Sequence, residues 1–272
     1  TALSATVGLG NIGGVAIAIS LGGPGAVFWM WGIGFLGMAT KLTEVTLTML
    51  YRKTDDRDNP HGGPMYVIRD GLKMRFPGSG MLGSVLGGLF CLTCLVSAAI
   101  GGNMFQAWNA GAITEEYFGV PSIATGIFLA VIVGMVIIGG IQRIGAVTGR
   151  LVPVMIALYL LAAIYVLIVN FAYLPEMFGL IFAGAFSTLD ASGAFIGGTM
   201  GYAFLFGMKR ALFSNEAGQG TSPIAHAAAR TREPVREGIV AGLEPFIDTI
   251  VVCTLTALVI LSTAVWQRGA EA

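Results

Sequence analysis

Long apolar runs free of charged residues make up most of the chain. They cover residues 1–40, 76–114, 117–142, 151–175, 191–208 and 249–267. A helix needs about 20 apolar residues to cross a bilayer, and the first run is long enough for two. The runs do not alternate as the strands of a membrane barrel do, so they predict helices. We therefore expect an all-α, polytopic membrane protein with about seven transmembrane helices, near residues 1–21, 26–51, 81–113, 123–140, 151–173, 191–208 and 240–265.

The charged residues between these runs predict the orientation. Six, two and five Lys and Arg residues follow the second, fourth and sixth helices, whereas the loops after the first, third and fifth carry none. Positively charged loops stay in the cytoplasm, so even-numbered helices should end there. The segment after the second helix also holds a short amphipathic helix, at about residues 64–72, which Pro64 would open and Gly71 would close.

Composition narrows the functional classes. The chain is 55% hydrophobic and 11% charged, with a mean hydropathy of +0.80, whereas a soluble domain carries about 25% charged residues. This excludes a soluble globular enzyme. The net charge is zero, and no basic block points to nucleic acid. No arrangement of Ser, His, Asp or Cys typical of nucleophilic catalysis is apparent, so we expect neither enzymatic activity nor a cofactor.

Two of the expected helices are interrupted by glycine. The first contains Gly8, Gly10, Gly13 and Gly14, and the sixth contains Gly193, Gly197, Gly198, Gly201 and Gly207. Because these helices are five apart, they cross the membrane in opposite senses. A matched pair of broken helices in inverted repeats is the best sequence indication of a transporter site. Close packing of small residues is the alternative, and the inverted spacing favours a site.

Polar residues inside the apolar runs are the candidates for chemistry. Asn11 lies within the first interruption, and Thr199 lies within the sixth helix. Gln106 sits in a stripe with Asn103 and Asn109, which would face protein or a water-filled cavity. Asp248 is the deeper of two carboxylates on the seventh helix and could hold a cation or act in gating. For each, a purely structural hydrogen bond or a shallow position remains the alternative. The polar run 214–223 is typical of turns and helix caps on the cytoplasmic side.

Several longer motifs resemble one family. They are Gly8-Leu9-Gly10-Asn11-Ile12, Leu21-Gly22-Gly23-Pro24-Gly25-Ala26, Gly37-Met38-Ala39-Thr40-Lys41, Gly62-Gly63-Pro64-Met65-Tyr66, Leu212-Phe213-Ser214-Asn215-Glu216-Ala217-Gly218 and the run 248–258. Together they resemble the alanine or glycine:cation symporter family along essentially the whole chain. The resemblance implies a five-plus-five inverted-repeat fold with discontinuous helices 1 and 6. Residues 1–272 would then form a single transmembrane transporter domain truncated at both ends, with the first repeat at about 1–175 and two helices of the second at about 184–266.

The resemblance also implies an activity: secondary active symport of a small neutral amino acid, alanine or glycine, by alternating access. Sodium would be the co-transported ion, or protons in some members, and the protein would be multi-pass in the bacterial inner membrane. The partners would then be the amino acid, sodium and the lipid bilayer. A channel or a structural subunit of a membrane complex is the alternative, and saturable, sodium-dependent uptake would distinguish the symporter from both.

The implied site has two parts. The substrate would contact residues of both interruptions and their neighbours: Gly8, Leu9, Gly10, Asn11, Gln106, Gly198, Thr199, Met200 and Phe204. Backbone N–H groups at 9–11 would bind its carboxylate, and Met200 or Phe204 would exclude large side chains. The cation would lie beside Ala5, Thr6, Asn11, Thr199 and Asp248.

Overall fold

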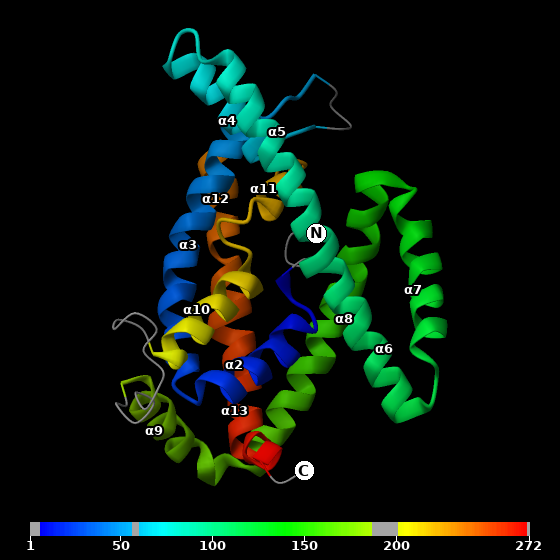
Figure 1. Ribbon diagram of the computed structural model, residues 1–272, viewed down its shortest axis with the longest axis vertical. Helices are drawn as coiled ribbons and strands as arrows, with labels where there is room; N and C mark the ends of the chain where they lie inside the picture. Colours follow the sequence, from blue (N-terminus) through cyan, green and yellow to red (C-terminus); the bar gives the residue numbers. More distant parts are fainter. Residues whose placement is uncertain (1–5, 56–59, 187–200, 271–272) are drawn as a thin grey trace. The chain divides into compact units, whose positions relative to one another are not determined.

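The computed structural model describes residues 6–55, 60–186 and 201–270. Throughout that part, regular structure is helical apart from one isolated bridge between Lys53 and His61. The chain forms two compact units, drawn in Figure 1. Unit 1 contains Lys41–Val152 and Gln219–Ala241, and unit 2 contains Thr6–Thr40, Pro153–Gly218 and Gly242–Ala272. Each unit is described by itself below.

Unit 1 is a set of helices with largely exposed apolar surfaces. It holds the second part of α3 (Ala26–Tyr51), then α4 (Pro64–Arg75), α5 (Gly80–Ser97), η2 (Ala98–Met104), α6 (Phe105–Phe118), α7 (Ser122–Ile137), the start of α8 (Gly140–Val169), α11 (Thr221–His226) and α12 (Pro234–Gly242). α6 and α7 form an antiparallel hairpin, seen in green in Figure 1. Gly119 ends α6 in the left-handed region, and its N–H bonds the carbonyl of Glu115 at 3.1 Å.

The amphipathic helix of the long polar loop is confirmed as α4, although it continues past Gly71 to Arg75. It folds back along α5 because two glycines of α5 let the backbones approach. A Cβ atom at Gly83 or Gly87 would lie 3.0 Å from a backbone carbonyl oxygen of α4. The sequence thus encodes this contact as small residues one turn apart.

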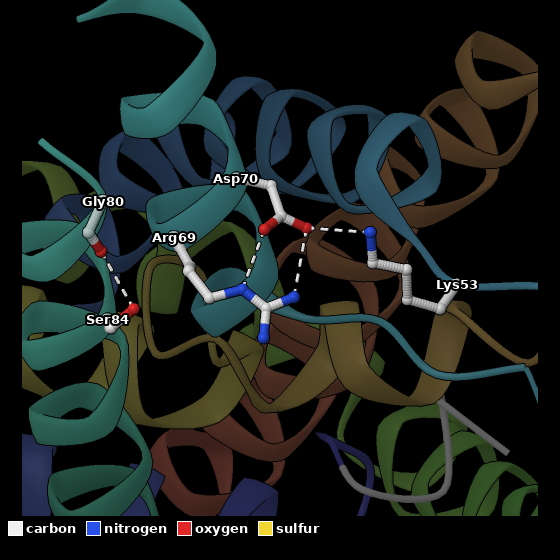
Figure 2. Close-up of polar contacts among 5 residues, drawn as sticks. All are labelled: Lys53, Arg69, Asp70, Gly80 and Ser84. Atoms are coloured by element: carbon white, nitrogen blue, oxygen red, sulfur yellow. Dashed lines mark hydrogen bonds and ion pairs between the residues drawn. The ribbon is translucent and has the colours of Figure 1, made fainter. Parts of the chain in front are cut away.

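An ion-pair network links α4 to the end of α3, as Figure 2 shows. The Asp70 carboxylate accepts hydrogen bonds from Nε and Nη2 of Arg69 at 2.8 and 3.2 Å. It also pairs with Nζ of Lys53 at 3.0 Å. These bonds, that of Arg69 first, lower the pKa of Asp70 from 3.8 to about 2. The network is partly exposed, so its contribution to stability is small.

Arg52 holds the segment that follows α11. Its guanidinium donates to the carbonyl oxygens of Ala227 and Ala229 at 2.9 and 2.7 Å, and to that of Thr231. One side chain therefore provides hydrogen bonds to three carbonyl groups of the irregular segment that follows the helix.

Unit 2 contains the main apolar core. Its elements are η1 (Gly10–Gly14), α2 (Val15–Gly22), the first part of α3, the second part of α8, η3 (Phe171–Tyr173), α9 (Leu174–Ala185), α10 (Tyr202–Asn215), η6 (Phe246–Val252), α13 (Cys253–Ser262) and η7 (Val265–Ala270). α2 packs along α10 and against α13. The buried side chains include Ile19, Met30, Ile181, Leu258 and Leu261.

Glycines set the close approaches within unit 2. The expected turn after the first helix is confirmed, because Gly23 has a φ of +69° between α2 and α3. At Gly25, an added Cβ would lie 2.2 Å from the backbone of Gly184 in α9. At Gly207 of α10, it would lie 2.4 Å from the carbonyl oxygen of Ala26 in α3. These positions admit no side chain without a backbone shift.

The membrane-spanning character is confirmed, with different helix bounds. Among the described residues, three helices are long and apolar enough to cross a bilayer: Gly80–Phe118, Gln142–Val169 and Pro234–Ser262. Gly10–Gly22, Ser122–Ile137 and Phe171–Ala185 are shorter apolar helices. The first two long spans bury only 6% of their most apolar window, as expected of surfaces that face lipid.

Two expected boundaries are wrong. The fifth helix begins at Gly140 instead of 151, so Arg143 and Arg150 lie in a helix and not in a loop. Most of the expected sixth helix, 191–208, lies outside the described residues. α10 then runs from Tyr202 to Asn215, so Lys209 and Arg210 are also helical. The reason is local: the helix stops only at Glu216, which adopts the left-handed conformation, and Gly218 and Gly220 also have positive φ.

Candidate functional site

A buried polar cluster joins the first interruption to the last transmembrane segment within unit 2. Nδ2 of Asn11 lies 2.5 Å from Oδ1 of Asp248 and 3.1 Å from Oγ of Ser214. It also lies 3.5 Å from the backbone carbonyl oxygen of Asp248 and 3.4 Å from Sγ of Cys253. Asn11 and Asp248 are 1% and 0% exposed. Two residues 237 positions apart, both expected in the cation site, are therefore brought together.

Both residues lie in irregular helical segments. Asn11 lies in η1 and Asp248 in η6, and both are π-helical segments, which occur frequently at functional sites. Before η1, the Asn11 side chain closes a turn by accepting the N–H of Gly8 at 2.9 Å. The backbone N–H of Asn11 donates to the carbonyl of Gly8 at 3.0 Å. That N–H is bonded within the protein, and the prediction that backbone N–H groups at 9–11 bind a substrate carboxylate stays a prediction.

The end of α10 completes the cluster. Oδ2 of Asp248 accepts the hydroxyl of Thr249 at 3.0 Å, and Oγ1 of Thr249 accepts Nδ2 of Asn215 at 3.4 Å. Oδ1 of Asn215 accepts the N–H of Ala217 at 3.0 Å and so shapes the turn that ends the helix. The polar run 214–223 does form a turn, as expected, but its first two side chains are buried.

α3 approaches this cluster through glycines. A Cβ at Gly34 would lie 3.1 Å from Thr249, and one at Gly37 would lie 2.9 Å from Nδ2 of Asn215. The glycines of the apolar second helix thus bring a helix surface directly against the polar groups.

Arg210 lies on α10 one turn before Ser214, and it is 7% exposed. Its Nε and Nη2 atoms are buried and have no hydrogen-bond partner among the residues that the structure describes. Its guanidinium lies over the ring of Phe213, with 5.4 Å from Cζ to the ring centroid. The expectation that Arg210 belongs to a cytoplasmic loop is wrong, because the helix continues through it and its side chain packs into unit 2.

The other predicted site residues that the structure describes belong to both units. Gln106 is half-buried on α6 in unit 1, directly after η2. The ring of Phe204 packs edge-on against Trp29, with centroids 4.8 Å apart. Thr6 is buried. Ala5, Gly198, Thr199 and Met200 lie outside the described residues, so the predictions made for them stay predictions.

Sequence reasoning missed Arg210, Ser214, Asn215, Thr249 and Cys253. One signal was present: Arg210 and Ser214 are four apart, as are Thr249 and Cys253, so each pair shares a helix face. The polar residues that follow Ser214 concealed it, because they made the segment resemble an aqueous loop.

The cluster has the chemistry of a cation site. An amide NH₂ group has two protons, yet Nδ2 of Asn11 has three oxygens and a sulfur within hydrogen-bonding distance. A monovalent cation can bind several oxygens at once, and Asp248 supplies a negative charge. Among the described residues, no group of three His, Cys, Asp or Glu side chains could hold a metal ion.

Comparisons with known proteins identify the family. The model of the sodium:alanine symporter family matches residues 1–272. The chain is 46% identical to the sodium/alanine symporter AgcS of Methanococcus maripaludis over 96% of its own length and 55% of that protein. It is 39% identical to the putative sodium/proton-dependent alanine carrier protein YrbD of Bacillus subtilis, over 99% and 53%, and 38% identical to the probable sodium/glutamine symporter GlnT of the same organism, over 95% and 51%. The chain therefore spans about half the length of these relatives.

Proposed function

Because this chain belongs to the sodium:alanine symporter family, we propose that its protein is a secondary transporter that couples a small neutral amino acid to sodium. Alanine or glycine is the proposed substrate, and the bacterial inner membrane is the proposed location. Relatives named for alanine and for glutamine support the amino-acid class. Transport would proceed by alternating access, without enzymatic chemistry or a cofactor.

The observation that carries the proposal is the contact between Asn11 and Asp248. A carboxylate buried in a membrane protein is costly unless it is paired, and such residues mark ion pathways. Here the carboxylate receives hydrogen bonds from an amide and a hydroxyl and forms no ion pair within the described residues. Sodium would bind Asp248 and the hydroxyl of Ser214, and the amide of Asn11 would turn to present its oxygen.

The proposed fold is the five-plus-five inverted repeat, and the backbone supports its broken helices. The first interruption includes the turn at Gly8 and the π-helical η1. We propose that the glycine-rich break at 197–200, which lies outside the described residues, is its counterpart in the second repeat. The first repeat would comprise about 1–175, and the first two helices of the second repeat about 184–266, of a single transporter domain.

The remaining predicted residues belong to the substrate part of the proposal. Gln106 would hold the substrate ammonium, and Leu9 and Gly10 would contact the rest of its backbone. Gly198, Thr199, Met200 and Phe204 would limit the size of the side chain, with Ala5 and Thr6 beside the cation.

Uptake of radiolabelled alanine into proteoliposomes tests the proposal. The protein, expressed at its full natural length, should accumulate alanine when an inward sodium gradient is imposed and not when choline replaces sodium. Asp248→Asn should raise the sodium concentration for half-maximal uptake at least tenfold, about 1.4 kcal/mol of binding free energy. Asn11→Ala should act in the same direction.

Two matched variants serve as controls. Glu176→Gln removes an exposed carboxylate on α9, and Asn109→Ala removes an amide that bonds its own helix, at the carbonyl of Phe105. Both should leave the sodium dependence unchanged. Flux that does not saturate would identify a channel, and absence of any flux from the folded protein would favour a structural subunit.

A further inference from the structure

The buried guanidinium of Arg210 is not explained by the cation site. A buried cation is stable only when it is paired and its donors are satisfied. Two of its nitrogen atoms, Nε and Nη2, are buried, and no group within residues 6–55, 60–186 or 201–270 forms a hydrogen bond with them. The ring of Phe213 covers one side of the group but accepts no conventional hydrogen bond. The side chain is therefore a buried guanidinium, and some of its N–H donors have no acceptor in the described part of the chain.

Two glycines of η1 create the space for this guanidinium. A Cβ at Gly14 would lie 2.2 Å from Nη1 of Arg210, and one at Gly10 would lie 3.0 Å from Nη2. The two glycines are four residues apart, so they line one face of the first interruption. Because neither glycine has a side chain, the guanidinium can lie directly against the backbone of η1, the segment that contains Asn11.

Arg210 and Asp248 belong to one cluster but do not pair. The ion pairs formed by described residues do not include Arg210, and the Asp248 oxygens accept Asn11 and Thr249 instead. Both side chains are nevertheless placed beside η1, because Asp248 contacts Asn11 and the Arg210 guanidinium lies against Gly10 and Gly14. The site thus contains one positive and one negative group, each with capacity for a further ligand.

We propose that Arg210 binds the α-carboxylate of the amino-acid substrate and thereby couples substrate binding to sodium binding. This inference rests on the proposed function. Without ligands, the charges of Arg210 and Asp248 offset each other. A sodium ion bound to Asp248 neutralises its negative charge, so the positive charge of Arg210 is no longer compensated. The substrate carboxylate then provides the compensating negative charge. By reciprocity, the bound carboxylate strengthens sodium binding by the same factor.

Guanidinium geometry suits this ligand. Arginine presents donors in a planar fork that matches the two oxygens of a carboxylate, whereas lysine acts as a point charge. Chloride could also bind a buried guanidinium, and a permanent counter-charge for Asp248 would need no ligand at all. These two explanations are the competing outcomes of the experiment.

The test measures binding of L-alanine and of L-alaninamide, which lacks the carboxylate, to the purified full-length protein in sodium and in choline. The wild type should bind alanine at least tenfold more tightly than alaninamide in sodium, and this preference should shrink in choline. Arg210→Gln should weaken the binding of alanine at least tenfold and should change the affinity for alaninamide less than threefold. Lys209→Gln is the matched control: it removes the adjacent positive charge, which lies over Phe206, and should alter neither ligand.

Each other result overturns the inference. Equal weakening of both ligands by Arg210→Gln would show a structural or counter-charge role. Loss of wild-type alanine binding when gluconate replaces chloride would identify chloride as the anion. If the Gln variant does not fold, Arg210→Lys decides, because it keeps the charge and should reduce the preference for alanine at least threefold; an unchanged preference would refute the proposal. Absence of sodium-dependent alanine binding by the wild type would instead refute the proposed function itself.

Discussion

The close approach of α10 to α3 gives a prediction about stability. Gly207→Ala places a Cβ 2.4 Å from the carbonyl oxygen of Ala26 and 2.9 Å from Cβ of Trp29. The first distance is roughly 1 Å shorter than a normal contact, and a backbone atom cannot rotate away. Overpacking of this kind costs about 1–3 kcal/mol, against a gain of about 0.5–1 kcal/mol for replacing glycine inside a helix.

Gly32→Ala is the matched control, because Gly32 is exposed on α3 and an added Cβ there meets nothing within 4 Å. The control receives the same helical gain without the overlap. The melting temperature of the purified protein in detergent, read by the loss of the monodisperse peak after heating, should fall for Gly207→Ala by roughly 2–8 °C relative to Gly32→Ala. Equal melting temperatures for the two variants would refute the packing argument.

Two predictions concern unit 1. Arg52→Gln should lower the free energy of unfolding by about 2 kcal/mol, because three carbonyl groups lose a charged donor. The control is Arg75→Gln, which removes an exposed arginine. Equal stability of the two variants would show that the hydrogen bonds of Arg52 to Ala227, Ala229 and Thr231 do not stabilise the protein. Asp70→Asn should cost less than about 1 kcal/mol at pH 7. Since the folded pKa of Asp70 is about 2 and its usual value is 3.8, its stabilisation is present above pH 4 and lost as pH falls towards 2. A pH series of melting temperatures should therefore show the two proteins converge in acid, and a constant difference would exclude the carboxylate charge as the cause.

The sequence predicted those parts of the site that are unusual for their surroundings. Asn11 and Asp248 are polar residues in apolar runs, so their cost in a membrane marks them without any knowledge of the fold. Their contact could not be predicted, because nothing local relates positions that are 237 residues apart.

Arg210 and Ser214 show the opposite case. Arg210 precedes the polar run 214–223 and Ser214 begins it. In the sequence alone, a helix that ends in polar residues resembles a helix that leaves the membrane. Burial is a property of tertiary packing, here of Gly10 and Gly14 against the guanidinium. The same limit applies to the start of α8, where arginines lie inside a helix that hydropathy alone begins later.

The π-helical segments η1 and η6 also bear on how the site changes shape. A π-helical turn accommodates an extra residue, so moving the bulge along a helix by one position rotates the residue it passes by roughly 100°. The flanking α-helical turns keep their hydrogen bonds during such a shift. Asn11 and Asp248 therefore lie in helical segments whose register can shift, so their side chains can be redirected without unfolding the helices that carry them.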